Sequence, residues 1–220
     1  MSRTRIKLCG MTRAEDVALA VALEVDFIGL IFAERSPRKV TLEHAAALRT
    51  LVPSTTAVVA LLMDNPRADV DAVVSRVRPD VLQFHGGEDD GFCTSFGLQF
   101  WKAIAMGEGG DPFPAMARHP AADGFVLDGH AAGEAGGSGR RFDWDRLPRD
   151  AERPILLAGG LTAGNVGVAV RAARPWGWMS PAGLNVHPGS RTRRRCDASS
   201  PRCAPPMLAR LTRRSGRLCG

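Results

Sequence analysis

Short, nearly continuous apolar runs recur along the chain at fairly even intervals. Seven are visible, each with the length of a single strand: Ile6–Cys9, Phe27–Phe32, Ala57–Met63, Val81–Phe84, Phe100–Ile104, Gly124–Asp128 and Ile155–Ala158. Strands that are buried on both faces of a parallel sheet have this pattern, because neither face alternates with polar residues. The runs therefore predict a buried parallel sheet.

The segments between these runs carry helical periodicity instead. Apolar residues three or four positions apart form one stripe in residues 14–24, 42–51, 70–77 and 162–173, as expected of helices that pack on a sheet. Thr12, three residues before Glu15, is the predicted N-cap of the first helix, and Thr162 is the predicted N-cap of the last. Strands that alternate with helices indicate βα units.

Seven strands at a spacing of about 25 residues leave room for an eighth near residues 176–181, and eight βα units predict an α/β (β/α)8 TIM barrel. The alternative is an open, doubly wound sheet. That fold calls for a Gly-x-Gly-x-x-Gly phosphate loop after the first strand, where this chain has Cys9-Gly10-Met11-Thr12. A length of 220 residues suits one large domain.

The last fifth of the chain has a different composition. Residues 178–220 contain nine arginines and one acid, Asp197, so the net charge of +6 comes entirely from this segment. We expect a barrel domain over residues 1–177 and a basic, Pro/Arg-rich tail over residues 178–220 that is disordered. A disordered tail is a simpler interpretation than a nucleic-acid-binding one, because no aromatic residue after Trp178 offers a stacking surface.

Cysteine usage and hydropathy restrict the setting. The five cysteines have no paired spacing, which argues against a disulfide framework, and the absence of a Cys-x-x-Cys pair argues against a zinc site. The sequence shows neither a secretory signal nor a membrane span. The expected location is the cytoplasm.

Residues that follow the strands of a barrel line one active site. The candidates at these positions are Cys9, Arg38, Asp64, Gln83, His85, Lys102, Asp128, the run Gly136–Gly139 and the pair Gly159–Gly160. Each also has a structural interpretation: Cys9 as a small buried hydrophobe, Asp128 as a loop cap, His85 as a packed histidine, Arg38 as a surface charge. Cys93, between Phe92 and Phe96, is expected in the core.

The two glycine clusters differ in strength. Glycines at a helix start expose main-chain N–H groups that bind phosphate, and Gly159–Gly160 precede the predicted helix at Thr162. The run Gly136–Gly139 alone is often only a flexible loop.

Taken together, these motifs resemble the phosphoribosylanthranilate isomerases of tryptophan biosynthesis. The matching pieces occur in the family's order over residues 5–177: Lys7-Leu8-Cys9-Gly10-Met11-Thr12, Gly29-Leu30-Ile31-Phe32, Ser36-Pro37-Arg38, Gln83-Phe84-His85-Gly86, Phe125-Val126-Leu127-Asp128, Gly136-Gly137-Ser138-Gly139 with Phe142-Asp143-Trp144, and Leu157-Ala158-Gly159-Gly160-Leu161 with Asn165-Val166. The resemblance implies an Amadori rearrangement of N-(5'-phosphoribosyl)anthranilate, without a metal or an organic cofactor.

The same resemblance implies roles for individual residues. Asp128 would be the general acid that opens the ribose ring, and Cys9 the general base that removes the proton from C2. Arg38 would clamp the anthranilate carboxylate. Substrate binding is further implied for Lys7, Gln83 and His85, and phosphate binding for Gly137, Ser138, Gly159 and Gly160. Lys7 would also supply positive potential beside Cys9, which needs it to form a thiolate. The expected partner is the sugar-phosphate substrate, with no nucleic acid or membrane partner, and a monomer is the default.

The likeness to the family weakens after residue 177. The family's eighth strand reads approximately Gly-Val-Asp-Val-Ser-Ser-Gly-x-Glu, whereas this chain continues Trp178-Met179-Ser180-Pro181. The Trp and Met codons, read one base earlier, give Asp at the second triplet. We therefore hypothesise that residues 178–220 are translated out of frame, which sequencing of the gene around codon 177 tests. On this hypothesis the eighth strand and helix are missing or non-native.

Three alternatives to an active isomerase follow from the sequence. One is an inactive barrel remnant that at most binds a sugar phosphate. Another is a nucleic-acid binder that acts through the arginines of the tail. The third is a related barrel enzyme acting on the next intermediate of the pathway, which would need a lysine-rich site, and Lys102 is the only mid-chain candidate.

Overall fold

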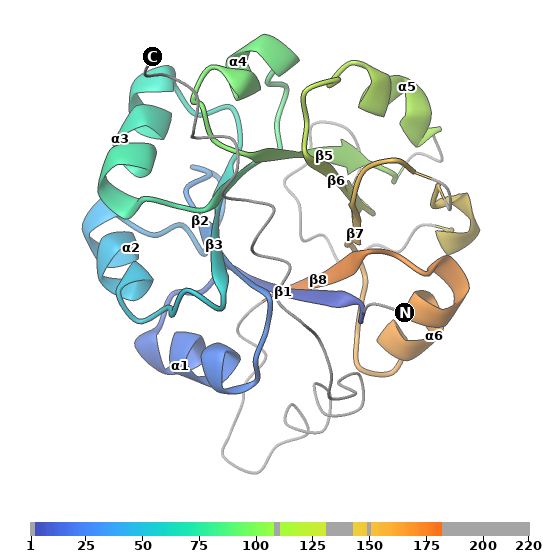
Figure 1. Ribbon diagram of the computed structural model, residues 1–220, viewed down its shortest axis with the longest axis horizontal. Helices are drawn as coiled ribbons and strands as arrows, with labels where there is room; N and C mark the ends of the chain where they lie inside the picture. The colour runs from blue at the N-terminus through green and yellow to red at the C-terminus, as the bar shows by residue number, and fades with distance from the viewer. Residues whose placement is uncertain (1–2, 108–110, 131–142, 149–150, 182–220) are drawn as a thin grey trace, which may run out of the picture.

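Eight parallel strands close into a barrel in the order of the sequence (Figure 1). The computed structural model describes residues 3–107, 111–130, 143–148 and 151–181. Its strands are β1 (Arg5–Cys9), β2 (Phe27–Ile31), β3 (Ala57–Leu62), β4 (Val81–Phe84), β5 (Phe100–Ala105), β6 (Gly124–Asp128), β7 (Ile155–Leu157) and β8 (Gly177–Pro181). All seven apolar runs form strands, so the barrel prediction is confirmed.

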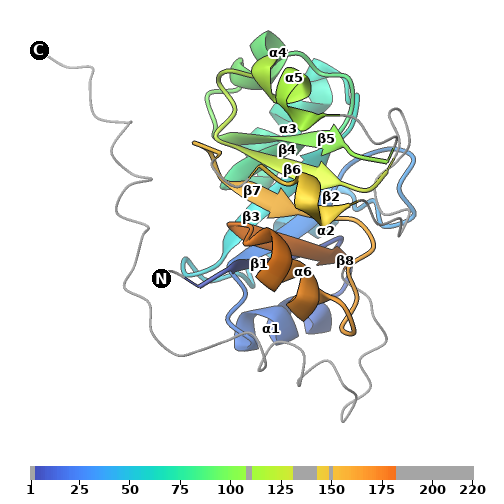
Figure 2. The ribbon, with the colours of Figure 1, turned by 90° about the vertical axis from the view of Figure 1, so that its right-hand side faces the viewer.

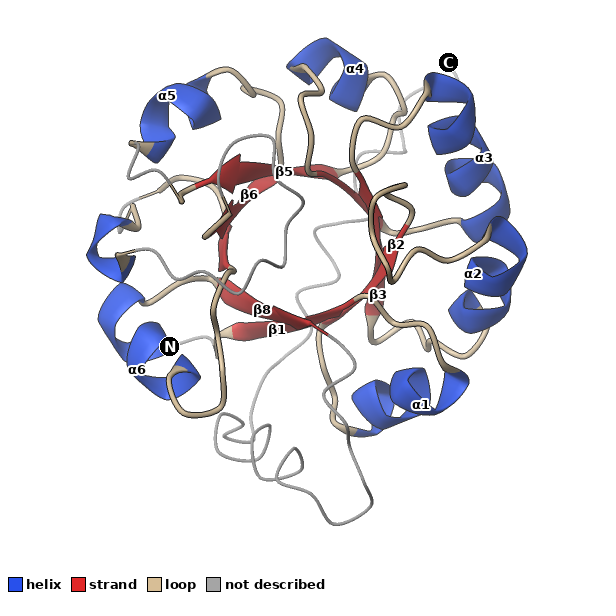
Figure 3. Cartoon of the chain, turned by 180° about the vertical axis from the view of Figure 1, so that it is seen from behind, coloured by secondary structure: helices blue, strands red, loops and turns tan. Residues whose placement is uncertain are grey.

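The helices surround the strands as an outer ring, which is clearest from behind (Figure 3). They are α1 (Ala14–Ala22), α2 (Leu42–Arg49), α3 (Arg67–Val77), α4 (Asp90–Thr94), α5 (Pro112–Ala117) and α6 (Val166–Ala173). The described residues between β6 and β7 include the 3-10 turn η1 (Trp144–Arg146). In the part of the chain that the structure describes, no helix has the length and apolar character needed to cross a membrane.

Two predicted helix caps are wrong. Helix α1 has Arg13 at its N-cap position, with no side-chain cap, and the carbonyl of Thr12 instead lies 2.7 Å from His44 Nε2. Helix α6 has Asn165 at its N-cap position rather than Thr162. The Asn165 side chain accepts a hydrogen bond from Thr162 N at 2.7 Å and donates one to Gly160 O at 2.9 Å. These bonds fold the preceding residues into a turn and delay the helix.

An eighth strand forms where the spacing left room for it, so the expectation that this strand is missing is wrong, whereas the expectation that it is non-native stays a prediction. Strand β8 pairs with β1 from Arg5↔Gly177 to Cys9↔Pro181, and with β7 at Leu156 and Leu157. Pro181 is the last residue of the strand, so its missing N–H leaves the middle of the ladder intact. The barrel therefore continues past residue 177 to residue 181. Residues 182–220, and with them any eighth helix, lie outside the described residues, so the disorder of the tail and its reading frame stay predictions.

The barrel core has an outer and an inner layer. Side chains on the outer face of the strands, such as Ile28 and Leu82, pack under the helices. The inner face holds a separate apolar cluster that includes Val59, Trp101 and Leu156. Successive strand residues point to opposite faces, so every second residue of a strand faces the interior. The interior also holds four buried polar residues: Lys7, Gln83, His85 and Asp128.

Candidate active site

A cavity of about 190 Å³ opens at the carboxyl ends of the strands, which share one end of the barrel (Figure 2). Its walls combine apolar side chains with a thiol, an imidazole, a carboxylate and two guanidinium groups. The residues that line it include Cys9, Arg35, Arg38, His85, Asp128, Gly159, Gly160 and Met179. The cavity therefore brings together six residues that the sequence predicted for the site.

Cys9 ends β1 and carries a buried free thiol. The Lys7 ammonium nitrogen, two residues earlier on the same face, lies 3.1 Å from Cys9 Sγ and 3.2 Å from Met179 Sδ. A Cβ atom at Gly29 would lie 2.7 Å from Cys9 Sγ and 3.0 Å from Lys7 Nζ. The absence of a side chain at Gly29 thus leaves room for the thiol and ammonium to meet. Lys7 itself is fully buried and does not line the cavity.

Arg38 reaches the cavity from the loop after β2. Its Nη1 donates a hydrogen bond to the carbonyl of Cys9 at 3.0 Å, which holds the guanidinium group above the first strand. Gly10 permits this approach, because a Cβ atom there would lie 2.7 Å from Arg38 Nη1. Arg35 also lines the cavity and was missed by the sequence analysis. The sequence could have indicated it, because Arg35 is a second arginine only three residues before Arg38.

Asp128 ends β6 between two histidines. Its Oδ2 lies 3.8 Å from His85 Nε2, and its Oδ1 lies 3.6 Å from His130 Nδ1. The two imidazole rings stack with their centres 4.6 Å apart. All three side chains are buried. His130 was not predicted as a site residue, although its position two residues after Asp128 could have indicated it.

Burial and charge set the protonation of this cluster. Burial lowers the pKa of His85 to about 4, and the neighbouring Asp128 opposes this only in part. Burial alone would raise the pKa of Asp128, but the adjacent His130 and His85 outweigh it and the net shift is downward. At neutral pH the cluster in the free protein therefore contains a neutral His85 and an ionised Asp128.

Gln83 lies in the barrel interior, below His85, and does not line the cavity. Its Nε2 is 3.3 Å from His85 Nδ1. The substrate contacts expected for Lys7 and Gln83 stay predictions. Both lie behind the residues that line the cavity, because each is two positions deeper in its strand than Cys9 or His85.

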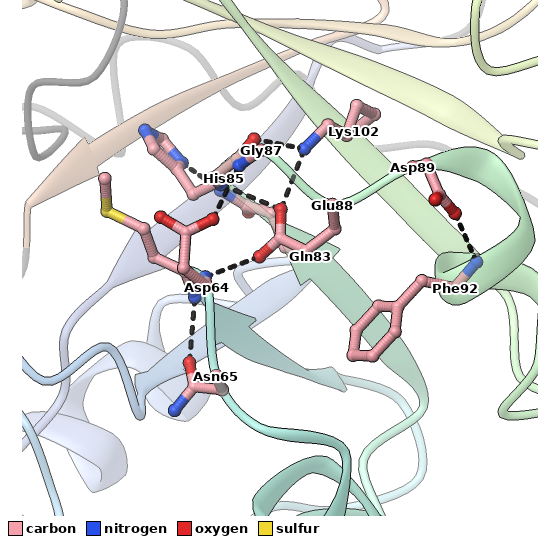
Figure 4. A network of polar contacts seen from close by, with 11 residues as sticks. Asp64, Asn65, Gln83, His85, Gly87, Glu88, Asp89, Phe92 and Lys102 are labelled. Atoms are coloured by element: carbon pink, nitrogen blue, oxygen red, sulfur yellow. Dashed lines mark hydrogen bonds and ion pairs between the residues drawn. The ribbon is translucent and has the colours of Figure 1, made fainter.

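A network of polar contacts around the buried pair Glu88 and Lys102 holds the loop that follows His85 (Figure 4). Glu88 Oε2 lies 2.8 Å from Lys102 Nζ and accepts a hydrogen bond from Gly86 N at 2.9 Å, while Glu88 Oε1 accepts one from Asp64 N at 2.8 Å. Asp64 Oδ1 in turn accepts a hydrogen bond from Gly87 N at 2.7 Å. The candidates Lys102 and Asp64 thus form contacts that stabilise this loop, and neither lines the cavity. This argues against the lysine-dependent alternative enzyme.

The loop after β7 forms another part of the cavity wall. Gly159 and Gly160 have φ angles of +83° and +60°, which glycine adopts at no steric cost. Asn165 fixes this loop through its bond to Gly160 O. Gly137 and Ser138, predicted to bind phosphate, lie outside the described residues. Cys93 is in the core as predicted, and burial raises the pKa of its thiol to about 12.

Comparison with known proteins gives one consistent result. The family model described as N-(5'phosphoribosyl)anthranilate (PRA) isomerase matches residues 6–189. A curated N-(5'-phosphoribosyl)anthranilate isomerase from Xanthomonas campestris pv. campestris (strain 8004) is 50% identical over 193 residues, covering 85% of this chain and 87% of the relative. The match to the family model thus continues past residue 177.

Two solved structures with the same fold carry the same name. The crystal structure of phosphoribosyl anthranilate isomerase from Thermotoga maritima is 28% identical, with a TM-score of 0.75, and the match covers 88% of this chain and 95% of that one. A phosphoribosyl anthranilate isomerase in complex with reduced 1-(o-carboxyphenylamino)-1-deoxyribulose 5-phosphate is 24% identical, with a TM-score of 0.71 and coverage of 88% and 94%.

Proposed function

The chain belongs to the N-(5'-phosphoribosyl)anthranilate isomerase family, and from this membership we propose that Cys9 and Asp128 carry the proton transfers of its reaction. The activity is the rearrangement of N-(5'-phosphoribosyl)anthranilate to 1-(2-carboxyphenylamino)-1-deoxyribulose 5-phosphate, a step of tryptophan biosynthesis. Its ligand is a small phosphorylated molecule. The observation that carries the residue assignment is that a thiol and a carboxyl group from non-adjacent strands face one cavity.

The reaction needs an acid and a base on different sides of the sugar. Asp128 donates a proton to the ring oxygen of the ribose, the C1–O bond breaks, and the electron pair of the nitrogen forms a Schiff base. Cys9, as a thiolate, then removes the proton from C2. The resulting enolamine tautomerises to the aminoketone product.

Asp128 must be protonated when the substrate is bound, although it is ionised in the free protein. The substrate supplies a reason for the change, because its phosphate and carboxylate place negative charge in the cavity and favour the neutral form of a nearby carboxyl group. Lys7 lies next to the other reacting group. Its ammonium nitrogen lies 3.1 Å from Cys9 Sγ and places a positive charge beside the proposed base.

The cavity offers one binding group for each charged end of the substrate. Arg38 lines the cavity beside Cys9, and a guanidinium group binds a carboxylate with paired hydrogen bonds. We assign it to the anthranilate carboxylate. Gly159 and Gly160 line the wall before α6, where main-chain N–H groups suit the phosphate. Phosphate contacts from Gly137 and Ser138, a monomeric state and a cytoplasmic location stay predictions.

A turnover assay tests the assignment by following the loss of the fluorescent substrate. Cys9→Ala and Asp128→Asn should each lower kcat by about 10²–10⁴-fold, the usual contribution of a positioned acid or base. Cys93→Ala is the matched control, because it removes a thiol from the core and should leave kcat unchanged. Parental turnover in either site variant would refute the assignment, whereas a parent chain without turnover would support the inactive-remnant alternative.

A further inference from the structure

Three buried ligand atoms meet at the rim of the barrel without hydrogen-bond partners among the described residues. They are His85 Nε2, Asp128 Oδ1 and His130 Nδ1. The exposed fractions of their residues are 6%, 2% and 3%. A buried polar atom without a partner costs free energy, so a cluster of three indicates that a group absent from the structure satisfies them.

The spacing of these atoms suits a metal ion. One ligand atom from each residue lies within 4.8 Å of the others. His130 Nδ1 is 3.6 Å from Asp128 Oδ1, and His85 Nε2 is 3.8 Å from the other carboxylate oxygen, Oδ2. Zinc binds imidazole nitrogen and carboxylate oxygen at about 2.0–2.2 Å, which places tetrahedral ligands about 3.3–3.6 Å apart. Ligand atoms up to 4.8 Å apart would have to approach one another by up to about 1.2 Å to complete the coordination.

The surroundings of His85 can orient its ring for a metal. Gln83 Nε2 faces His85 Nδ1 at 3.3 Å, and Gln83 Oε1 has no partner among the described residues. A half-turn of the Gln83 amide would place Oε1 against Nδ1–H and leave the Nε2 lone pair free for coordination. A metal-bound histidine is commonly held in this way through its second nitrogen.

The charge balance and the access to the site fit the same ion. Lys7 and Lys102 act on His85 as positive charges, and Lys102 is paired with Glu88, while Arg35 and Arg38 line the same cavity. The carboxylate of Asp128 supplies one negative charge to the ligand set. His85 and Asp128 line the cavity, so a fourth position is open to water or to a ligand. Two imidazoles and one carboxylate with an open position are typical of zinc and neighbouring transition metals.

We propose that His85, Asp128 and His130 form a site for a divalent transition-metal ion of the zinc class, and that the bound ion inhibits isomerisation. An ion that coordinates Asp128 Oδ1 prevents this carboxyl group from carrying a proton to the ribose ring. The inhibition rests on the proposed role of Asp128, whereas the binding does not. The two parts can therefore be tested separately.

The binding test is a titration of the metal-free full chain with Co²⁺, followed by its visible absorption bands and by competition with Zn²⁺. His130→Asn should weaken binding at this site by more than about 10-fold. His44→Asn, which changes an exposed histidine on α2, is the matched control and should bind as the parent does. The difference between parent and variant spectra isolates this site from metal bound by the other cysteines and histidines of the chain.

The inhibition test measures turnover with and without Zn²⁺. Zn²⁺ should inhibit the parent and His44→Asn, and EDTA should restore the rate; His130→Asn should turn over without metal and resist Zn²⁺. His130→Gln and the urea midpoint of each variant guard against a folding defect. Equal Co²⁺ affinity in the parent and both folded His130 variants would overturn the site. Binding at the site without inhibition would overturn the inhibitory role alone, and absence of turnover in the parent would leave the Co²⁺ titration decisive for binding.

Discussion

The ammonium nitrogen of Lys7 lies between two sulfur atoms, 3.1 Å from Cys9 Sγ and 3.2 Å from Met179 Sδ. Lys7 is fully buried, and no carboxylate among the described residues forms an ion pair with it. A buried cation without an opposite charge is costly. A thiolate on Cys9 would be its counter-ion, which couples the charge of this lysine to the state of the proposed base.

Lys7→Met tests this coupling while keeping most of the side-chain volume. Without the ammonium beside Cys9 Sγ, kcat should fall by at least about 10-fold. The measurement is the turnover of parent and variant. Parental kcat in the variant would remove Lys7 from the mechanism.

Met179→Asp should place a carboxylate against Lys7, because residue 179 pairs with Lys7 across β1 and β8. The same position receives Asp when the codons for Trp178 and Met179 are read one base earlier. We expect the variant to be more stable than the parent by about 1.5–3 kcal/mol, because the buried ammonium gains a hydrogen bond to a charged acceptor. Urea unfolding measures the change, and Met179→Asn, which is polar but uncharged, is the control. An equal effect of both variants would contradict a charge-based explanation.

Gly29→Ala should disturb the pair formed by Lys7 and Cys9. The added Cβ would lie 2.7 Å from Cys9 Sγ, so one side chain must move, at a cost of about 1–3 kcal/mol. We expect kcat to fall at least about 10-fold with the fold retained. Gly164→Ala is the matched control, because its nearest atom, Thr162 Oγ1, is 3.8 Å away. Parental activity in Gly29→Ala would show that the thiol tolerates displacement.

Glu88→Gln should destabilise the protein, because it leaves the buried Lys102 ammonium without its ion pair. Breaking one partner of such a pair typically costs about 3–5 kcal/mol, which urea unfolding can measure. The double variant Glu88→Gln/Lys102→Met should recover part of this loss. Glu43→Gln, which removes an exposed ion pair with Arg76, should have no measurable effect. Equal stability of Glu88→Gln and the parent would show that the network in Figure 4 is dispensable.

His85 should make the protein less stable in mild acid. Its pKa is about 4 in the folded protein and near its ordinary value in the unfolded chain, so between pH 4 and pH 6.5 only the unfolded chain binds the proton. The free energy of unfolding should therefore decrease as the pH falls through this window. From pH 7 to pH 5, the parent should lose about 2 kcal/mol more than His85→Gln. Parallel pH curves for the two proteins would contradict the buried, neutral state of His85.

The barrel and most of the cavity could be predicted from the sequence, because burial on two faces leaves a strong local signal. The spacing of the runs placed an eighth strand near residues 176–181, where β8 lies, but Trp178, Ser180 and Pro181 give only a weak local strand signal. Its conformation is set by pairing with β1 and β7, which no local pattern records. Thr12 and Thr162 failed as caps for a similar reason, because contacts with His44 and Asn165 determine those turns.

The residues around Asp128 show the same limit. His85 and Asp128 follow strands, so their convergence could be predicted, whereas His130 lies beyond the strand end and needed the fold to bring its ring against His85. Depth in the barrel was also hidden from the sequence. Motif likeness grouped Lys7 and Gln83 with the substrate-contacting residues, but their position two residues below the strand ends places them beneath the cavity floor.

Strand β8 has a wider consequence for what closure of this barrel requires. Main-chain hydrogen bonds do not depend on side-chain identity, so even residues with a weak strand signal complete the ring when their length and direction suit β1 and β7. The chemistry is more demanding, because it depends on particular side chains such as those of Cys9 and Asp128. A closed barrel is therefore weaker evidence of turnover than the side chains that line its cavity.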